Sequence, residues 1–557
     1  MRNIGLGLVL IFLVGCSGGE KGYRAAPEGG SAESMPSATD VGGAKLGTVV
    51  LTDSCEDAVR PDLERGLALL HSMTYEEAAS AFAQAAETDP GCALAYWGQA
   101  MTFVHPLWSD PPDSTTFARG AALVEQARER AANEKERAYV EALAGYYDAG
   151  RTGTERPNLV GFEAGWRQVH EAFPDDPEGA AFYALAQLAT VDPADKTFSK
   201  QRAAGALAEQ VLAAVPDHPG AHHYIIHAYD NPVLSANAAH VARSYGGVAP
   251  EVPHALHMPT HTFTRLGLWQ ESIDWNRRSA DAALQRPVGR QTSLHYFHAL
   301  DYLAYAYLQG AEDAQAEDVL RELERVEPPY QAHLASAYAF AAIPARLVLE
   351  RHMWEAAANL RARIPPDYPW DTAAASEAMS HFARALGAAR TGRFDEARSS
   401  LERLSEIKTR LDAATPYWAT QTEIQRLSAL AWLQFEEGRR EEGLSTMRAA
   451  ADLESRTEKH PVSPGEVLPA RELLADMLLE LGRPDQALGE YEAALNRSPN
   501  RFNSLYGAGR AAELSGDTQR AAAYFRALLA VCANADTERE RLRHAREYIG
   551  ATGLPGT

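Results

Sequence analysis

Apolar and small side chains recur at helical spacing along almost the whole chain, in units about 34 residues long. A unit has a glycine-containing turn, then a small residue, then an aromatic or bulky residue, and often a proline near its end. No stretch shows the strict polar–apolar alternation of a half-buried β-strand. The pattern predicts successive pairs of antiparallel helices. It is clearest in two C-terminal units, where Gly482, Ala487, Tyr491 and Ala494 are followed 34 residues later by Gly516, Ala521, Phe525 and Leu528.

A period of about 34 residues is that of the tetratricopeptide (TPR) repeat, in which small residues let two helices approach closely and aromatic residues fill the gap to the next pair. We therefore expect an all-α, TPR-like α-solenoid. We divide it into an N-terminal solenoid over residues 46–364, less regular helical repeats over 365–469, where proline-rich breaks interrupt the spacing, and a C-terminal pair of TPRs over 470–550.

The N-terminal end predicts export. The apolar run from Ile4 to Val14 is eleven residues long, which is too short to span a bilayer and is typical of a signal peptide, here over residues 1–15. Leu13-Val14-Gly15-Cys16 resembles a bacterial lipobox, which implies lipid attachment to Cys16. The alternative is an ordinary secretory signal with a chance cysteine.

The linker that follows predicts a tether. Residues 16–45 contain almost no large apolar side chain, so they cannot bury enough surface to offset the entropy of ordering. Together with the lipobox, the linker predicts a lipid-anchored protein of the cell envelope, periplasmic or surface-facing. Ser17, rather than an aspartate, follows the cysteine, and this favours the outer membrane.

Charge and cysteine content narrow the function classes. The formal net charge of −22 argues against nucleic-acid binding and against electrostatic attachment to anionic lipid. The remaining cysteines are Cys55, Cys92 and Cys532. Cys55 and Cys92 could form a disulfide in an oxidising compartment. Equally, Cys92 could be a small buried residue where helices meet.

Two histidine pairs stand one repeat apart. His223 and His227 precede His257 and His261 by 34 residues, histidine for histidine. The small residues of the second helices set a register in which three successive first helices place polar, metal-competent side chains at equivalent positions. These positions are His223, His257 and Asp301; His227, His261 and Tyr305; and Gly220, His254 and His298. This face of the first helix lines the concave side of a TPR domain, so the sequence predicts a histidine-lined groove.

Neutral imidazoles at i, i+4 on a helix are good ligands for zinc and other divalent transition metals. We therefore predict a metal site formed by His223, His227, His257 and His261, with His254, His298, Asp230 and Asp301 adjoining. Pro259 lies inside the second pair. It either starts a helix or kinks one that begins at Pro253.

Three other interpretations of the histidines remain open. They could hydrogen-bond to one another and to the backbone as a structural seam. The groove could instead bind a protein or peptide segment, as in an assembly adaptor. A metal-dependent hydrolase would use the bound ion to activate water, with Asp230, Glu251 or Glu271 as the base. Histidines without a partner one period away are expected to be structural or exposed, namely His71, His105, His170, His240, His333, His352, His381, His460 and His544.

Several strings along the chain resemble a bacterial family of exported TPR proteins and lipoproteins with paired histidines. The strings are Cys92-Ala93-Leu94-Ala95-Tyr96-Trp97-Gly98, His105-Pro106-Leu107-Trp108, His223-Tyr224-Ile225-Ile226-His227, His257-Met258-Pro259-Thr260-His261, His298-Ala299-Leu300-Asp301 and Ser498-Pro499-Asn500-Arg501-Phe502-Asn503. The resemblance covers most of the mature chain and implies export and the repeat fold, without an activity. Asp230 stands where the family usually carries glutamate.

Overall fold

The regular structure is helical, as the sequence predicts. The computed structural model describes residues 45–108, 110–151, 154–412 and 415–552. Within these ranges the only β-structure is a pair of isolated bridges, Val288–Gln291 and Thr292–Tyr330. The predicted signal peptide, the predicted lipidation site Cys16 and nearly all of the predicted tether lie outside the described residues. No described helix is both long and apolar enough to cross a membrane.

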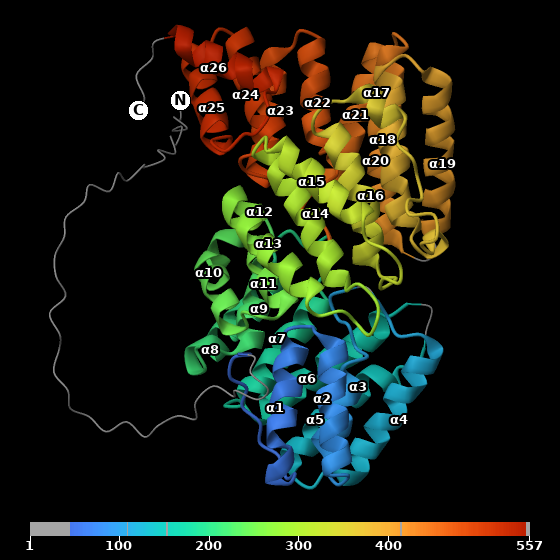
Figure 1. The fold of residues 1–557 in the computed structure, drawn as a ribbon, viewed down its shortest axis with the longest axis vertical. Helices are drawn as coiled ribbons and strands as arrows, with labels where there is room; N and C mark the ends of the chain where they lie inside the picture. The colour runs from blue at the N-terminus through green and yellow to red at the C-terminus, as the bar shows by residue number, and fades with distance from the viewer. Residues whose placement is uncertain (1–44, 109, 152–153, 413–414, 553–557) are drawn as a thin grey trace, which may run out of the picture. The chain divides into compact units, whose positions relative to one another are not determined.

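Four pairs of helices form the first part of the described chain (Figure 1). Local sequence sets their ends: Asp113 accepts a hydrogen bond from the backbone N–H of Thr116, and Asn133 and Glu136 form a capping box. The helices are α1 (Arg60–His71), α2 (Tyr75–Thr88), α3 (Ala93–Met101), α4 (Ser114–Arg130), α5 (Glu134–Asp148), α6 (Arg156–Ala172), α7 (Pro177–Ala189) and α8 (Ser199–Ala214).

The next repeats carry the histidines. Proline occupies the first turn of α9, α11 and α12, where its missing N–H costs no hydrogen bond. The helices are α9 (Pro219–Tyr229), α10 (Ala239–Val248), α11 (Pro253–His257), α12 (Pro259–Leu266), α13 (Trp269–Leu284), α14 (Leu294–Gln309) and α15 (Asp313–Glu324), with a short 3-10 helix η2 (Ser235–Ala238) before α10. The helix of the second histidine pair thus begins at Pro253 and is interrupted at Met258, just before Pro259.

Gly267 ends α12 and cannot be replaced without strain. Its φ of +65° lies in the left-handed region that favours glycine. A Cβ placed there would lie 2.4 Å from the carbonyl oxygen of Pro499, which is far inside van der Waals contact. The C-terminal repeats therefore approach the histidine repeats closely at this glycine.

The remaining helices continue the pairing to the end of the described chain. The segment that we expected to be less regular contains four long consecutive helices, α18 to α21, each packed on the next. The helices are α16 (Leu334–Leu349), α17 (Trp354–Ala358), α18 (Ala374–Arg390), α19 (Phe394–Asp412), α20 (Pro416–Glu436), α21 (Arg440–Ser455), α22 (Ala470–Glu480), α23 (Pro484–Arg497), α24 (Phe502–Leu514), α25 (Thr518–Val531) and α26 (Glu540–Thr552).

The segment 456–469, which contains no α-helix, returns to the middle of the chain. The hydroxyl of Tyr302 on α14 lies 3.1 Å from the carbonyl oxygens of both Pro461 and Ser463. Arg346 on α16 donates to the carbonyl oxygen of Gly465 at 2.8 Å. This segment, which the sequence marks only as a proline-rich break, therefore packs against the histidine repeats.

A buried ionic cluster joins the C-terminal repeats to α14 and α16. Arg501 is fully buried and donates to Glu350 at 2.9 Å, to Glu472 at 3.0 Å and to the hydroxyl of Tyr305 at 2.9 Å. Burial of a charge costs several kcal/mol unless partners compensate it. Removing Arg501 would leave two carboxylates facing each other in the interior.

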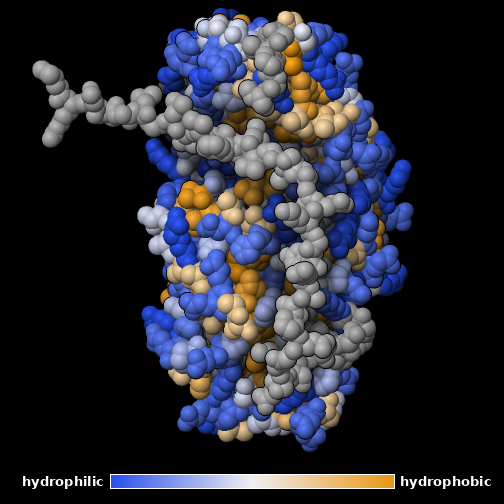
Figure 2. Space-filling view, turned by 90° about the vertical axis from the view of Figure 1, so that its left-hand side faces the viewer, coloured by the Kyte–Doolittle hydropathy of each residue, from blue (hydrophilic) through white to orange (hydrophobic). Residues whose placement is uncertain are grey.

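The distribution of hydrophilic and hydrophobic residues on the surface agrees with the amphipathic pattern of the helices. On the face shown in Figure 2, hydrophilic residues cover most of the described surface and hydrophobic residues gather in hollows between them. Cys55 and Cys92 form a disulfide, which resolves the two interpretations of this pair, and Cys532 is a buried free cysteine.

Candidate functional site

Six histidines from three successive repeats meet in the interior. His223 and His227 come from α9, His254 and His257 from α11, His261 from α12 and His298 from α14. Five of them are at most 3 % exposed, and His227 is half-buried. We expected the histidines to line an open groove, and that expectation is wrong. Trp108, Tyr302 and Lys459 pack against the histidines or the carboxylate that binds them, and close the space.

The structure groups these histidines as two triads rather than as the predicted four-histidine set. Triad A is His223, His227 and His254, and triad B is His257, His261 and His298. Within each triad, one ring nitrogen per histidine lies within 4.8 Å of the other two. The repeat period brings the pairs side by side, but the adjoining residues His254 and His298 complete each group. The ring centroids of His227 and His261 are 5.6 Å apart, so the triads are neighbours.

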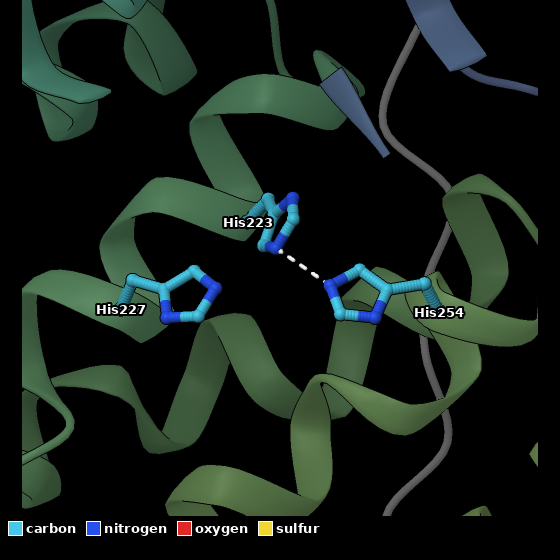
Figure 3. A group of neighbouring side chains, drawn as sticks. All are labelled: His223, His227 and His254. Atoms are coloured by element: carbon cyan, nitrogen blue, oxygen red, sulfur yellow. Dashed lines mark hydrogen bonds between the residues drawn. The ribbon is translucent and has the colours of Figure 1, made fainter. Parts of the chain in front are cut away.

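In triad A the three rings point toward one another, as Figure 3 shows. The Nε2 atoms of His223 and His254 are 3.2 Å apart. His223 Nδ1 donates its hydrogen to the carbonyl oxygen of His71 at 2.6 Å, so its Nε2 presents a lone pair to the triad. Among the described residues, His227 Nε2 and His254 Nδ1 are buried without a hydrogen-bond partner.

In triad B, hydrogen-bond acceptors outside the triad determine which ring nitrogen carries the hydrogen. His257 Nδ1 lies 2.7 Å from Asn276 Oδ1, and His261 Nδ1 lies 2.9 Å from Asp230 Oδ2. Asn276 donates through Nδ2 to the carbonyl oxygen of Ser272 at 2.8 Å, which establishes that its oxygen faces His257. Both histidines therefore carry their hydrogen on Nδ1. Their Nε2 atoms, each with a lone pair, face each other at 3.1 Å.

A cationic pair holds Asp230 in place. Arg265 Nε donates to its Oδ1 at 2.8 Å and Lys459 Nζ donates to its Oδ2 at 3.0 Å. Although burial alone would raise it, Lys459 and Arg265 hold the pKa of Asp230 well below its usual range. Burial lowers the pKa of Lys459 to about 8. Asp230 is thus an ionised acceptor for His261, next to the predicted metal site as expected for an adjoining residue.

Burial keeps the imidazoles neutral. It lowers the pKa of His223 to about 3 and the pKa values of His227, His254, His257 and His298 well below 6.5. The pKa of His261 is also lowered by burial, although Asp230 opposes the shift. Neutral imidazole is the form that coordinates a metal ion. The triads can therefore act as ligand sets at neutral pH.

A third cluster has similar residue types and a different chemistry. Glu178 accepts from His71 Nε2 at 2.7 Å and from His218 Nε2 at 3.1 Å, and all three side chains are fully buried. His218 Nδ1 accepts from the N–H of Ala221, and His71 Nδ1 lies 2.9 Å from the hydroxyl of Tyr224. Every ring nitrogen has a partner of the right kind, so this cluster is a satisfied hydrogen-bond network. His218 and Glu178 have no partner one period away, and sequence reasoning missed them.

The other acidic candidates belong to neither triad, and each lies within 4.0 Å of an arginine. Asp301 is bonded to Arg346, and burial raises the pKa of its carboxyl to about 6. Glu251 lies 3.5 Å from Arg286, and Glu271 lies 4.0 Å from Arg243.

Glu251 and Glu271 have side chains 56 % and 41 % exposed, whereas the triads are interior. Neither belongs to a triad, and their role as a hydrolytic base stays a prediction. They occupy solvated positions on or beside the helices that flank the histidines, and surface carboxylates are hydrated there at little cost.

One pocket is lined by a triad histidine, and a second is lined by a histidine that neighbours triad A. The first, of about 430 Å³, is lined by His227, Asp230, Lys459 and Trp418, together with apolar side chains. The other, of about 250 Å³, is lined by His105, Asp110, His295 and His333 and by Trp108. The ring of His295 is 5.2 Å from that of His254 in triad A.

One comparison with known proteins supports the repeat in the C-terminal helices. A family profile described as tetratricopeptide repeat matches residues 472–537, which span α22 to α25. No curated protein matches the chain. Among solved structures, the human IFIT1 dimer with m7Gppp-AAAA is 12 % identical, covers 85 % of this chain and 90 % of its own, and has a TM-score of 0.38. Yeast Tom70 is 12 % identical, covers 89 % and 96 %, and has a TM-score of 0.28.

Proposed function

We propose that this protein is an exported, lipid-anchored TPR scaffold whose histidine repeats bind divalent transition-metal ions, foremost zinc, one in triad A and one in triad B. The observation that supports this proposal is that His257 and His261 both carry their hydrogen on Nδ1. Two unprotonated nitrogens at 3.1 Å repel each other unless a cation or a hydrogen-bond donor lies between or beside them, and a metal ion satisfies both lone pairs at once. A shared proton would make one ring an imidazolium, and burial disfavours that charge in both rings.

The spacing of the nitrogens suits a metal ion. Zinc–nitrogen bonds of about 2.0–2.1 Å in tetrahedral geometry place neighbouring ligand nitrogens roughly 3.3 Å apart. The Nε2–Nε2 distances of 3.2 Å in triad A and 3.1 Å in triad B are close to this value. Three imidazoles with a fourth position open are a known ligand set for zinc.

The outer hydrogen bonds also favour metal binding. A histidine that binds a metal usually donates its other N–H to a carboxylate or carbonyl oxygen, which fixes the ring and raises its basicity. His223, His257 and His261 donate to a backbone carbonyl, an amide oxygen and a carboxylate, respectively. The satisfied cluster around Glu178 offers no comparable lone pairs, and we propose no metal there.

Export and membrane attachment rest on the sequence. The lipobox at Cys16 and the linker after it support an anchored protein of the cell envelope, periplasmic or surface-facing. The Cys55–Cys92 disulfide is in keeping with an oxidising compartment. Labelling with a fatty-acid analogue in a bacterial host tests the anchor. Loss of label in Cys16→Ser supports it, and unchanged label or no label in the parent contradicts it.

Protein binding is a second candidate function. The TPR fold suggests a protein-interaction scaffold, and the repeat profile match lies in the C-terminal helices, away from the triads. The acidic surface makes a protein partner more favourable than nucleic acid. Pull-downs from envelope extract, with the chain loaded with zinc or treated with a chelator, test this role.

Elemental analysis of protein purified without an affinity tag tests metal binding. We expect two zinc equivalents per chain, falling to one in His257→Ala, because triad B then loses a ligand. His240→Ala is the matched control, since His240 is exposed and belongs to neither triad. The absence of stoichiometric metal after incubation of the parent with zinc would remove the proposal, as would unchanged content in His257→Ala.

A further inference from the structure

The triads are buried, so a metal ion needs a route to them. We propose that the pocket lined by His105, Asp110, His295 and His333 admits the ion, and that His295 passes it to His254 of triad A. This inference rests on the proposed metal binding and adds the path of access. The route has three stages, which are capture at the pocket, transfer through His295 and delivery to triad A.

Charge and donor type make the pocket suitable for capture. Asp110 is half-exposed, and its Oδ2 lies 3.1 Å from His105 Nδ1 and 3.7 Å from His333 Nε2. Glu76 also lines the pocket, so two carboxylates attract a cation. Carboxylate oxygen is a ligand for zinc. The ring nitrogens of His105 and His333 already have partners in Asp110 and in backbone groups. The carboxylates therefore make the capture, and His295 is the first imidazole that the ion meets. The volume of about 250 Å³ is enough for a hydrated ion.

His295 connects this pocket to triad A. It lines the pocket, yet its side chain is only 8 % exposed, and its Nδ1 is buried without a hydrogen-bond partner among the described residues. Its ring lies 5.2 Å from that of His254, and the next step, from His254 to His223, is 4.9 Å. Successive imidazoles at such spacing allow an ion to exchange one ligand at a time without entering an apolar region.

Trp108 lines the side of this route. Its ring lies 5.3 Å from His254, 6.2 Å from His295 and 5.2 Å from His333. The indole packs beside the stretch between His295 and His254 and helps to exclude water from it. Its negative ring face also favours a nearby cation.

The larger pocket at His227 is less suited to admit a cation. Lys459 lines it and bonds to Asp230, so this carboxylate is already neutralised. The other two carboxylates of the pocket are also engaged, because Glu458 lies 3.0 Å from Lys196 and Asp195 accepts hydrogen bonds from Thr197 and Ser199. Its remaining walls include the apolar side chains of Leu107, Leu188 and Phe198. The free-energy cost of removing water from a cation is therefore better compensated on the side of His295.

The kinetics of zinc loading test this route. Full-length protein is stripped with a chelator, shown by circular dichroism to remain helical, and mixed with zinc in a stopped-flow instrument with a chromophoric indicator. We expect His295→Phe to load about 10-fold more slowly or worse, the effect of roughly 1.4 kcal/mol on an activation barrier. Its final content should remain two ions. His240→Phe makes the same change at an exposed position and should load like the parent.

A second variant separates the capture of zinc at the pocket from its transfer through His295. Asp110→Asn should slow loading at low ionic strength, and the difference should shrink as salt screens the carboxylate. Parent-like loading by both His295→Phe and Asp110→Asn would overturn the route while leaving metal binding intact. A lower final content in His295→Phe would also overturn it, because His295 would then be a permanent ligand. A parent chain that binds no zinc would overturn both proposals.

Discussion

Replacing Asn276 with leucine removes the oxygen that holds the proton of His257 on Nδ1. The residue is fully buried, and its Oδ1 lies 2.7 Å from that nitrogen. In the variant, His257 can carry its hydrogen on Nε2 instead and donate it to His261 Nε2, which is 3.1 Å away. The metal-free protein gains a hydrogen bond inside triad B, and the ligand nitrogen loses its lone pair.

The size of the effect follows from this exchange. Loss of an oxygen that orients a metal-binding histidine typically weakens metal affinity about 10- to 100-fold. That range equals about 1.4 to 2.7 kcal/mol of binding free energy. The new hydrogen bond stabilises the metal-free state by about 1 kcal/mol, and this partly offsets the stability lost with the buried amide. The gap in unfolding free energy between zinc-loaded and zinc-free protein should therefore shrink in Asn276→Leu.

Competition with a chromophoric chelator measures the affinity, and urea unfolding with and without zinc measures the gap. Asn158→Leu is the matched control, because Asn158 is buried, donates to the carbonyl oxygens of Tyr146 and Gly150, and lies away from both triads. It should lower stability by about 1–3 kcal/mol in both states and leave the affinity unchanged. A zinc affinity of Asn276→Leu equal to that of the parent would refute the reasoning.

Three further predictions concern the scaffold and are measured by urea unfolding. Arg501→Met should lower the free energy of unfolding by about 3–5 kcal/mol, because it leaves buried carboxylates unpaired. Arg520→Met, at a side chain that is 48 % exposed, is the control and should change it by less than about 1 kcal/mol. Equal effects of the two substitutions would contradict this prediction. Burial raises the pKa of Asp476 from 3.8 to about 6, so the native state binds a proton at this carboxyl more tightly than the unfolded state does. The free energy of unfolding should therefore fall by up to about 3 kcal/mol as the pH rises from roughly 4 to 6. Asp476→Asn should therefore gain stability on the parent across that interval, and a pH-independent difference would contradict it. Replacing Cys55 and Cys92 with alanine should lower stability by about 4 kcal/mol, because the disulfide closes a loop with a sequence separation of 37, and a loss below about 1 kcal/mol would contradict it.

The sequence predicts the fold well because the TPR signal is local. Gly482, Ala487 and Tyr491 each report the packing of one helix pair on the next, and the period repeats that information along the chain. The same register shows that His223 and His257 lie at equivalent places in neighbouring repeats. Such arguments reach only as far as adjacent units.

What the sequence cannot supply are contacts between distant segments. Lys459, on a segment that returns from far along the chain, bonds to Asp230, and Pro461 of the same segment accepts a hydrogen bond from Tyr302 on α14. The predicted groove is therefore an interior site. The division into two triads places His254 with the pair on α9, although His254 lies on the same helix as His257. Neither this grouping nor the return of the segment follows from repeat spacing.

Anomalous X-ray scattering from crystals of the zinc-loaded protein, recorded on both sides of the zinc absorption edge, tests the metal sites most directly. The account predicts one zinc peak in each triad, with bonds of about 2.0–2.1 Å to histidine nitrogens. In triad B these would include the Nε2 atoms of His257 and His261, which face each other at 3.1 Å. Crystals grown with excess zinc that show no peak among these histidines would contradict the account.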